Sequence, residues 1–239
     1  LKPTSLRQTR GGSPRSSSLD CRIHLMATRP VFLPSYEGPN LVDERHFDFP
    51  WSSGFAEVQK KKNVRALHEA AHSSGIGEVL EISSKSDVEL GRRLSAFSLK
   101  VELDGEMLPL ESVYQGAKVF RENGPFPEIM TLSPREAKQF IRENGKGDLV
   151  KFRIRSKDYS IHPKNAFYDW LYIRSLVSHS AWIEKNVTYS AFTDIEFNPL
   201  KQVNCQARAF SEYLSLHHRN ILHDAAENFD YFSSLLSPI

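Results

Sequence analysis

A carboxylate, an amide and an amine recur at helical spacing near the middle of the chain. Glu111, Gln115 and Lys118 stand at positions i, i+4 and i+7, which places them on one stripe of a helix. A carboxylate can move a proton or stabilise positive charge, an amide can bind hydroxyl groups, and a neutral lysine amine can attack an electrophilic carbon. The spacing alone favours a solvated polar face, so other residues must distinguish a site from a surface.

One helix over residues 109–124 is predicted to present these side chains. Pro109 stands in its first turn and Gly124 just past its end, which is the usual asymmetry of helix punctuation. A separate stripe of apolar residues is expected to face the core; its members are Leu110, Val113, Tyr114, Ala117 and Phe120. A hairpin over residues 97–110, turning at Asp104-Gly105, leads into this helix.

The other predicted elements give an α-rich α+β fold. Ser133 and Glu136 form a capping box with Pro134 at the first helical position, so a helix begins there and runs to about Glu143. Further helices are expected over residues 55–71, with Val58 facing inward, over 165–177, from 203 onward and within 221–236. Strands are expected over residues 30–34 at a sheet edge, over 77–82, and as a hairpin of 149–154 with 159–161.

The helix over residues 165–177 is apolar nearly all round and should be deeply buried. Asp169 interrupts it. A carboxylate in such a helix needs a partner or a chemical purpose, since burying an unpaired charge is costly.

Composition limits the classes of function. The chain has 239 residues and a formal net charge of +2, which is too small to indicate a nucleic-acid or membrane partner by itself. Cys21 and Cys205 cannot build a disulfide framework or a zinc site, and no metal or cofactor is expected. No apolar run approaches the roughly 20 residues that span a bilayer, so no membrane contact and a cytoplasmic location are expected.

Residues 1–25 are predicted to be a disordered basic tail rich in Ser and Arg, before a single domain over residues 26–239. The tail lacks the apolar segment of a secretory signal but has the composition of an organellar transit peptide. An over-extended translation explains it more simply, because Met26 opens a segment that looks like a natural start.

These residues together resemble the NADAR (YbiA-like) family. The resemblance rests on Ser95-Ala96-Phe97, the Asp104-Gly105 turn, the Glu111…Gln115…Lys118 pattern, Phe192-Thr193-Asp194 and Asn204. It covers roughly residues 30–215 and is closest to the branch encoded beside DarT-type toxins, which ADP-ribosylate DNA. Two positions depart from the family pattern: Ala96 replaces a frequent asparagine, and Phe192 a frequent tryptophan.

The resemblance implies a compact YbiA-like helical domain with small hairpins. It also implies a glycosidase that removes ADP-ribose from guanine bases in DNA and acts as an antitoxin, with the DarT-type toxin as a partner. Lys118, Glu111 and Asp194 would be catalytic, with Lys118 buried and facing Asp194. The substrate-binding residues would be Gln115, Ser95, Phe97, Asp169, Phe192 and Asn204; for Asp169, Phe192 and Asn204 a structural role explains the residue as well.

Two other functions fit the same residues. One is an N-glycosidase acting on small riboflavin-pathway intermediates, as other family members resemble. The other is a non-catalytic module that binds ADP-ribose or NAD, or that grips the toxin directly.

Overall fold

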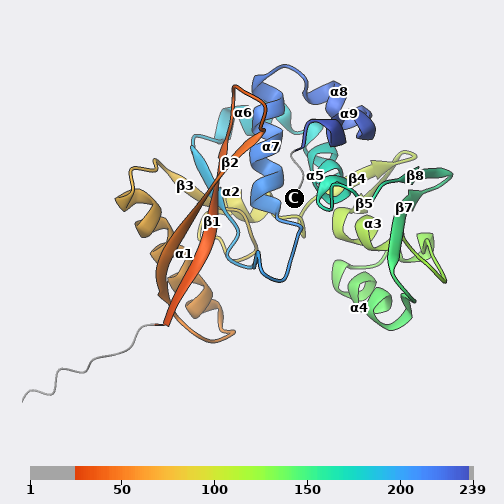
Figure 1. Ribbon diagram of the computed structural model, residues 1–239, viewed down its shortest axis with the longest axis horizontal. Coiled ribbons are helices and arrows are strands. Elements are labelled where there is room, and N and C mark those ends of the chain that lie inside the picture. The colour runs from red at the N-terminus through yellow and green to blue at the C-terminus, as the bar shows by residue number, and fades with distance from the viewer. Residues whose placement is uncertain (1–24, 237–239) are drawn as a thin grey trace, which may run out of the picture.

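Segments from both ends of the chain meet in the largest sheet of the protein (Figure 1). The structure is a computed structural model that describes residues 25–236. The sheet has the order β2-β1-β9-β3, built from β1 (Leu25–Pro34), β2 (Val42–Trp51), β9 (Ala191–Thr193) and β3 (Val79–Glu81). The expected tail over residues 1–25 lies outside the described residues apart from Leu25, which opens β1, and the single-domain boundary stays a prediction.

Alternation along these strands sends successive side chains into two cores on opposite faces of the sheet. Three pairs of consecutive residues show this alternation: Val31/Phe32, Val79/Leu80 and Ala191/Phe192. The first residue of each pair packs with α1 (Glu57–Ser73), and the second joins the larger core with α5 and α7. The sheet is therefore buried on both faces at its centre.

The helices α5 (Ala166–Val177) and α7 (Gln206–His218) form the centre of the larger core. Apart from Arg174 and Val177, every residue of α5 is buried, which confirms the prediction of a deeply buried helix. Shorter helices cover this pair: α6 (Ser180–Asn186), α8 (Leu222–Glu227) and α9 (Phe229–Ser234). The expected C-terminal helix is thus divided in two.

Two small sheets and a capped helix make up the other side of the molecule (Figure 1). β4 (Lys100–Leu103) pairs with β5 (Glu106–Pro109), and β6 (Lys118–Phe120) pairs with β7 (Leu149–Ile154), which pairs with β8 (Lys157–Tyr159). α4 (Pro134–Asn144) has the predicted capping box, with Ser133 and Glu136 bonded reciprocally. Two further short helical segments are α2 (Glu89–Arg93) and a 3-10 turn over Pro127–Ile129.

Two predictions about the sheet side were wrong. β1 is an interior strand, not an edge, since it pairs with β2 on one side and with β9 on the other. Its prolines are tolerated because only one register pair, Phe32↔Phe192, joins β1 to β9. Val58 is 61% exposed. It lies about 120° round α1 from Val64, which belongs to the stripe that packs on the sheet.

The predicted helix over residues 109–124 is much shorter in the structure. α3 spans Leu110–Gly116, and the chain then becomes extended so that Lys118 lies in β6, opposite Phe152 of β7. A β-branched and an aromatic residue, Val119 and Phe120, follow Lys118 and suit a strand. Tertiary pairing with β7 therefore overrides the helical periodicity.

Gly116, the last residue of α3, packs closely against neighbouring segments, because a Cβ there would lie 2.6 Å from Met130 Cγ and 2.8 Å from the Phe126 carbonyl oxygen. We expect Gly116→Ala to lower the free energy of unfolding by roughly 1–3 kcal/mol through overpacking, measured by urea denaturation. Gly77→Ala is the control, since its methyl group would meet the rotatable Ser190 hydroxyl at 2.8 Å. Equal stability of the two variants would contradict the crowding at Gly116.

Candidate active site

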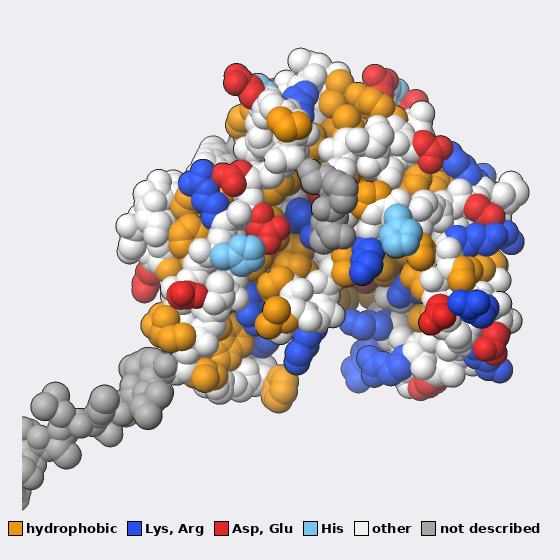
Figure 2. Space-filling view, in the orientation of Figure 1, with side chains coloured by type: hydrophobic (Ala, Val, Ile, Leu, Met, Phe, Trp, Pro, Cys, Tyr) orange, Lys and Arg blue, Asp and Glu red, His pale blue; other side chains and the backbone are white. Residues whose placement is uncertain are grey.

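A cavity of about 540 Å³ opens between α3, α4 and the segment that joins β9 to α7. Figure 2 shows the molecule hollowed at its lower edge, where Lys and Arg side chains gather. The walls carry ionisable and amide side chains from segments far apart in the sequence: Lys85, Glu111, Gln115, Lys118, Lys138, Asp194, Asn204 and Gln206. Phe97, Tyr114 and Tyr168 add aromatic surface.

Lys118 reaches this cavity from β6 and is held by α3. Its Nζ donates a 2.7 Å hydrogen bond to Gln115 Oε1 and lies 4.7 Å from the centre of the Tyr114 ring. Burial lowers the pKa of Lys118 to about 8, while the Glu111 carboxylate raises it and Lys138 lowers it. At that pKa roughly a tenth of the side chains are neutral at pH 7, against roughly one in 3,000 at the ordinary value.

Glu111 lies on the first turn of α3 and is bonded to α5. The Tyr168 hydroxyl donates a 2.9 Å hydrogen bond to Glu111 Oε1. Burial raises the pKa of Glu111, although the Tyr168 bond and the charges of Lys138 and Lys118 oppose the rise. The carboxyl is thus poised to take or give a proton nearer neutral pH than an exposed glutamate.

Asp194 follows β9 and is held from two sides. The backbone N–H of Glu196 donates to Asp194 Oδ1 at 3.1 Å, and the Gln206 side chain at the start of α7 bonds the same carboxyl. Burial raises the pKa of Asp194 well above its usual range, and the nearby Glu81 carboxylate adds to the rise. A protonated Asp194 is a proton donor at the cavity wall.

The turn that carries Asp194 is held by hydrogen bonds to the fully buried Glu81 of β3. Glu81 accepts hydrogen bonds from the Thr193 hydroxyl at 2.7 Å and the Ile195 N–H at 2.9 Å, the residues on either side of Asp194. The Ser83 hydroxyl donates a third, at 2.5 Å. Burial raises the pKa of Glu81 to about 7. His68 Nε2 lies 2.8 Å from Thr193 Oγ1, which links α1 to this turn.

The remaining predicted site residues divide into those at the cavity and those behind it. Asn204 lines the cavity and bonds the Tyr114 hydroxyl, and Phe97 lines it with 58% of its surface exposed. Ser95 is buried behind the wall, where its hydroxyl donates to Gln206 Oε1 at 3.3 Å. The Ala96 N–H donates to the same oxygen at 2.8 Å, so Ser95-Ala96 orients the amide that holds Asp194.

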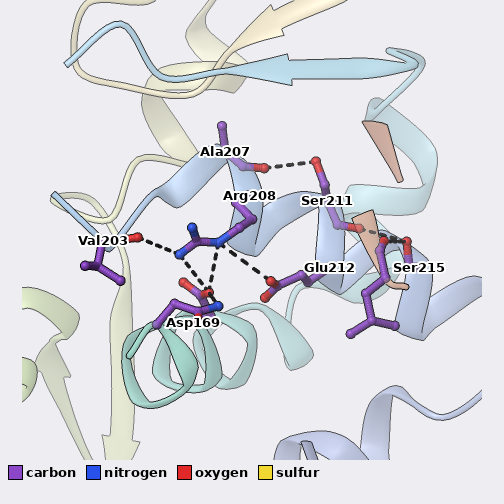
Figure 3. Close-up of polar contacts among 9 residues, drawn as sticks. Asp169, Val203, Ala207, Arg208, Ser211, Glu212 and Ser215 are labelled. Atoms are coloured by element: carbon purple, nitrogen blue, oxygen red, sulfur yellow. Dashed lines mark hydrogen bonds and ion pairs between the residues drawn. The ribbon is translucent and has the colours of Figure 1, made fainter. Parts of the chain in front are cut away.

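Phe192 and Asp169 do not line the cavity. Phe192 is fully buried in β9, with its ring edge-on to Phe210 at 4.9 Å, so it packs in the core. Asp169 faces α7 and accepts hydrogen bonds from Arg208 there (Figure 3). It also accepts a 2.7 Å hydrogen bond from Nδ2 of Asn165, the residue that precedes α5. Asp169 thus has the partner that its position in an apolar helix requires.

Arg208 lies between two buried carboxylates and also holds a cavity segment. Its guanidinium is 3.2 Å from Asp169 and 3.8 Å from Glu212, and it donates a 2.7 Å bond to the Val203 carbonyl (Figure 3). Asp169 Oδ1 and Glu212 Oε2 have no donor if both acids are ionised. Because burial raises the pKa of both acids, a proton shared between them satisfies both oxygens.

The sequence analysis missed several residues of the cavity. Tyr168 adjoins Asp169, and its position is visible only once α5 is placed beside α3. Lys85 and Lys138 come from a loop and from the exposed side of α4, and nothing in their neighbourhood distinguishes them from ordinary surface lysines. Glu81 had a usable signal, because it is a carboxylate within an apolar strand, like Asp169 within an apolar helix.

Metal ligands do not cluster in the described part of the chain: no three His, Cys, Asp or Glu residues among 25–236 are arranged to hold an ion. Over the same residues, every helix is too short or too polar to cross a membrane.

Buried acids and a lysine of lowered pKa at a cavity are features found both in enzymes and in ligand-binding proteins, so they mark a candidate site without naming its activity. The comparison with protein families is more specific. The family described as DarT1-associated NADAR antitoxin, NADAR-DarT1, matches residues 27–238. The chain therefore belongs to this family, which confirms the resemblance to NADAR proteins and to the toxin-associated branch.

The family name indicates an antitoxin role with a DarT1 toxin as counterpart. No curated protein matches the chain. The YbiA-like form of the fold and a cytoplasmic location stay predictions.

The buried acids make a sharp contrast in stability testable. We expect Arg208→Ala to lower the free energy of unfolding by about 3–5 kcal/mol, because it leaves buried carboxylates without a counter-charge. Glu212→Gln should cost less than about 1 kcal/mol, since its amide replaces the protonated acid and can donate to Asp169. Urea denaturation of both variants measures the difference, and a Glu212→Gln cost equal to that of Arg208→Ala would exclude the shared proton.

Proposed function

We propose that this protein is an N-glycosidase that removes ADP-ribose from guanine bases in DNA and so reverses the action of its toxin. The observation that carries the proposal is the lysine amine of lowered pKa, held by Gln115 in a cavity that also contains Glu111 and Asp194. Membership of a DarT1-associated antitoxin family supports the biological role.

Lys118 is the proposed nucleophile. Its neutral amine attacks C1 of the ribose, and the bond from C1 to the guanine nitrogen breaks as that nitrogen takes up a proton. Opening of the ribose ring, with the proton going to the ring oxygen, leaves a Schiff base between C1 and Nζ. Water then adds to this C=N bond, which releases ADP-ribose and restores the amine. The reaction consumes one water and needs no oxidant or reductant.

The two acids have complementary roles in this scheme. Asp194, with its pKa raised by burial, supplies the proton to the departing base. Glu111 stabilises the positive charge that develops on the sugar, and the Tyr168 hydroxyl fixes its orientation. Gln115 orients the lysine amine through its carbonyl oxygen, which leaves its NH₂ group to face the ribose hydroxyls.

DNA as the substrate is supported by the basic side chains at the cavity. Lys85 lines the cavity from a loop and Lys138 lines it from α4. Neither lysine has a role in the proposed chemistry. Two such cations suit the phosphates that flank a nucleotide drawn into the site, and they are consistent with a protein of small net charge.

Replacement of the nucleophile gives the direct test. Lys118→Arg should reduce release of ADP-ribose from ADP-ribosylated guanine DNA by at least about a thousandfold, because an arginine stays protonated and forms no Schiff base. Borohydride reduction during turnover should attach ADP-ribose covalently to the wild-type protein at Lys118, seen by mass spectrometry, and not to the variant.

The matched control is Lys157→Arg, a lysine that lies over the Tyr159 ring away from the cavity. Near-normal turnover by Lys118→Arg would exclude the nucleophile. Release of a sugar phosphate from a riboflavin-pathway intermediate, with no release from DNA, would exclude the DNA substrate and favour the small-molecule function.

The pH dependence should follow the lysine. Because burial lowers the pKa of Lys118 to about 8, the neutral amine increases with pH up to that value, and kcat/KM should rise and then level off above about pH 8. Glu111 raises the pKa of Lys118, so Glu111→Gln should move the rising limb to lower pH even though its maximum is reduced. A wild-type profile that is flat between about pH 6 and 8 would contradict the role of the free amine.

A further inference from the structure

A second cavity adjoins the first and has a different character. This side pocket, about 370 Å³, lies between β7 and the segments around residues 161–164 and 203–204. Leu149, Phe152 and Ile161 give it apolar walls, and His162 and Lys164 stand at its exposed rim.

Tyr114, Val203 and Asn204 form the boundary between the two cavities, because all three residues line both of them. The side chains of Tyr114 and Asn204 are hydrogen-bonded to each other at this boundary. The Tyr114 ring has Lys118 Nζ at 4.7 Å from its centre and the Phe152 ring at 5.5 Å. A ligand that occupies both cavities therefore crosses this boundary.

The contrast in chemistry indicates what each cavity binds. The main cavity has the acids, amide and amine proposed to react with a ribose, whereas the side pocket has apolar and aromatic surface with one lysine, Lys164, at its rim. Such a pocket suits one flat heterocycle attached to phosphate. A DNA strand instead needs a series of cations, and Lys85 and Lys138 line the main cavity but not the side pocket.

We propose that the side pocket binds the adenosine end of the ADP-ribosyl group, while the ribose at the other end reacts at Lys118. This assignment rests on the proposed function. The diphosphate then crosses the boundary at Asn204 toward Lys164, and the DNA leaves the main cavity past Lys85 and Lys138. The protein recognises the modification by both of its ends.

Binding measurements test the assignment without turnover. Ile161→Glu places a carboxylate in the apolar wall, and Lys164→Glu reverses a charge at the exposed rim without touching the core. Calorimetry should show that Ile161→Glu binds free ADP-ribose at least roughly tenfold more weakly than the wild type, about the value of one stacked base. Lys164→Glu should weaken it in the same direction.

Ribose 5-phosphate is the matched ligand, because it has the reacting ribose but no adenosine. Its weak affinity, measured by NMR titration, should be unchanged in both variants. Lys157→Glu is the control for charge reversal outside the pocket and should bind both ligands as the wild type does. If Ile161→Glu does not fold, by circular dichroism, Lys164→Glu decides the question alone.

Three results would overturn the proposal. ADP-ribose affinity could be unchanged in the folded variants. The affinities for ADP-ribose and ribose 5-phosphate could fall together. The variants could bind free ADP-ribose normally but fail only on ADP-ribosylated oligonucleotides, which would assign the side pocket to the DNA strand. A wild-type protein that binds ADP-ribose but releases none from DNA would instead refute the proposed function and leave the pocket assignment standing.

Discussion

Removal of ionisable side chains from water is the constraint on which this structure depends. Asp169, Arg208 and Glu212 stand in the core between α5 and α7, where two acids face one guanidinium. A buried charge is tolerated only if it is paired, bonded or neutralised by a proton. The two acids are paired with Arg208 and hydrogen-bonded, and burial raises the pKa of both. Arg208 also donates a hydrogen bond to the Val203 carbonyl and so fixes the segment that carries Asn204. The contacts of Arg208 that allow two acids to be buried in the core thus also position one wall of the cavity.

Burial disfavours the charged form of the three proposed catalytic groups, Lys118, Glu111 and Asp194. The amine of Lys118 loses its proton more readily, and the acids Glu111 and Asp194 keep theirs more readily. The proposed reaction uses both effects, because a neutral amine attacks the carbon while Asp194 supplies a proton to the departing base. α5 provides the connection, because Tyr168 faces Glu111 in the cavity and the next residue, Asp169, faces Arg208 in the core.

Local patterns in the sequence predicted what depends on local forces. The capping box at Ser133 and the buried α5 were foreseen because hydrogen bonds and hydrophobicity within a few residues determine them. The length of α3 was not, since Gly116 and the pairing of Lys118 with β7 depend on residues 14 to 34 positions away (Met130, Phe152). Lys118 nevertheless reaches Gln115 because i and i+3 remain close when the helix gives way to a strand. The positions of Tyr168 and Lys138 at the cavity could not be predicted from the sequence, because they depend on how α5 and α4 pack beside α3.

The pairing of β1 with β9 has a consequence for how the chain acquires its structure. Phe32 meets Phe192, so the central strand of the sheet waits for a partner from the far end of the chain. The β1–β2 hairpin and α1 can form early from neighbouring segments, but the turn with Asp194 has no support until β9 is inserted between β1 and β3. Contacts of such long sequence separation form slowly, because the loop entropy is lost before the contact energy is gained. During synthesis, the candidate site is therefore among the last parts of this protein to become ordered.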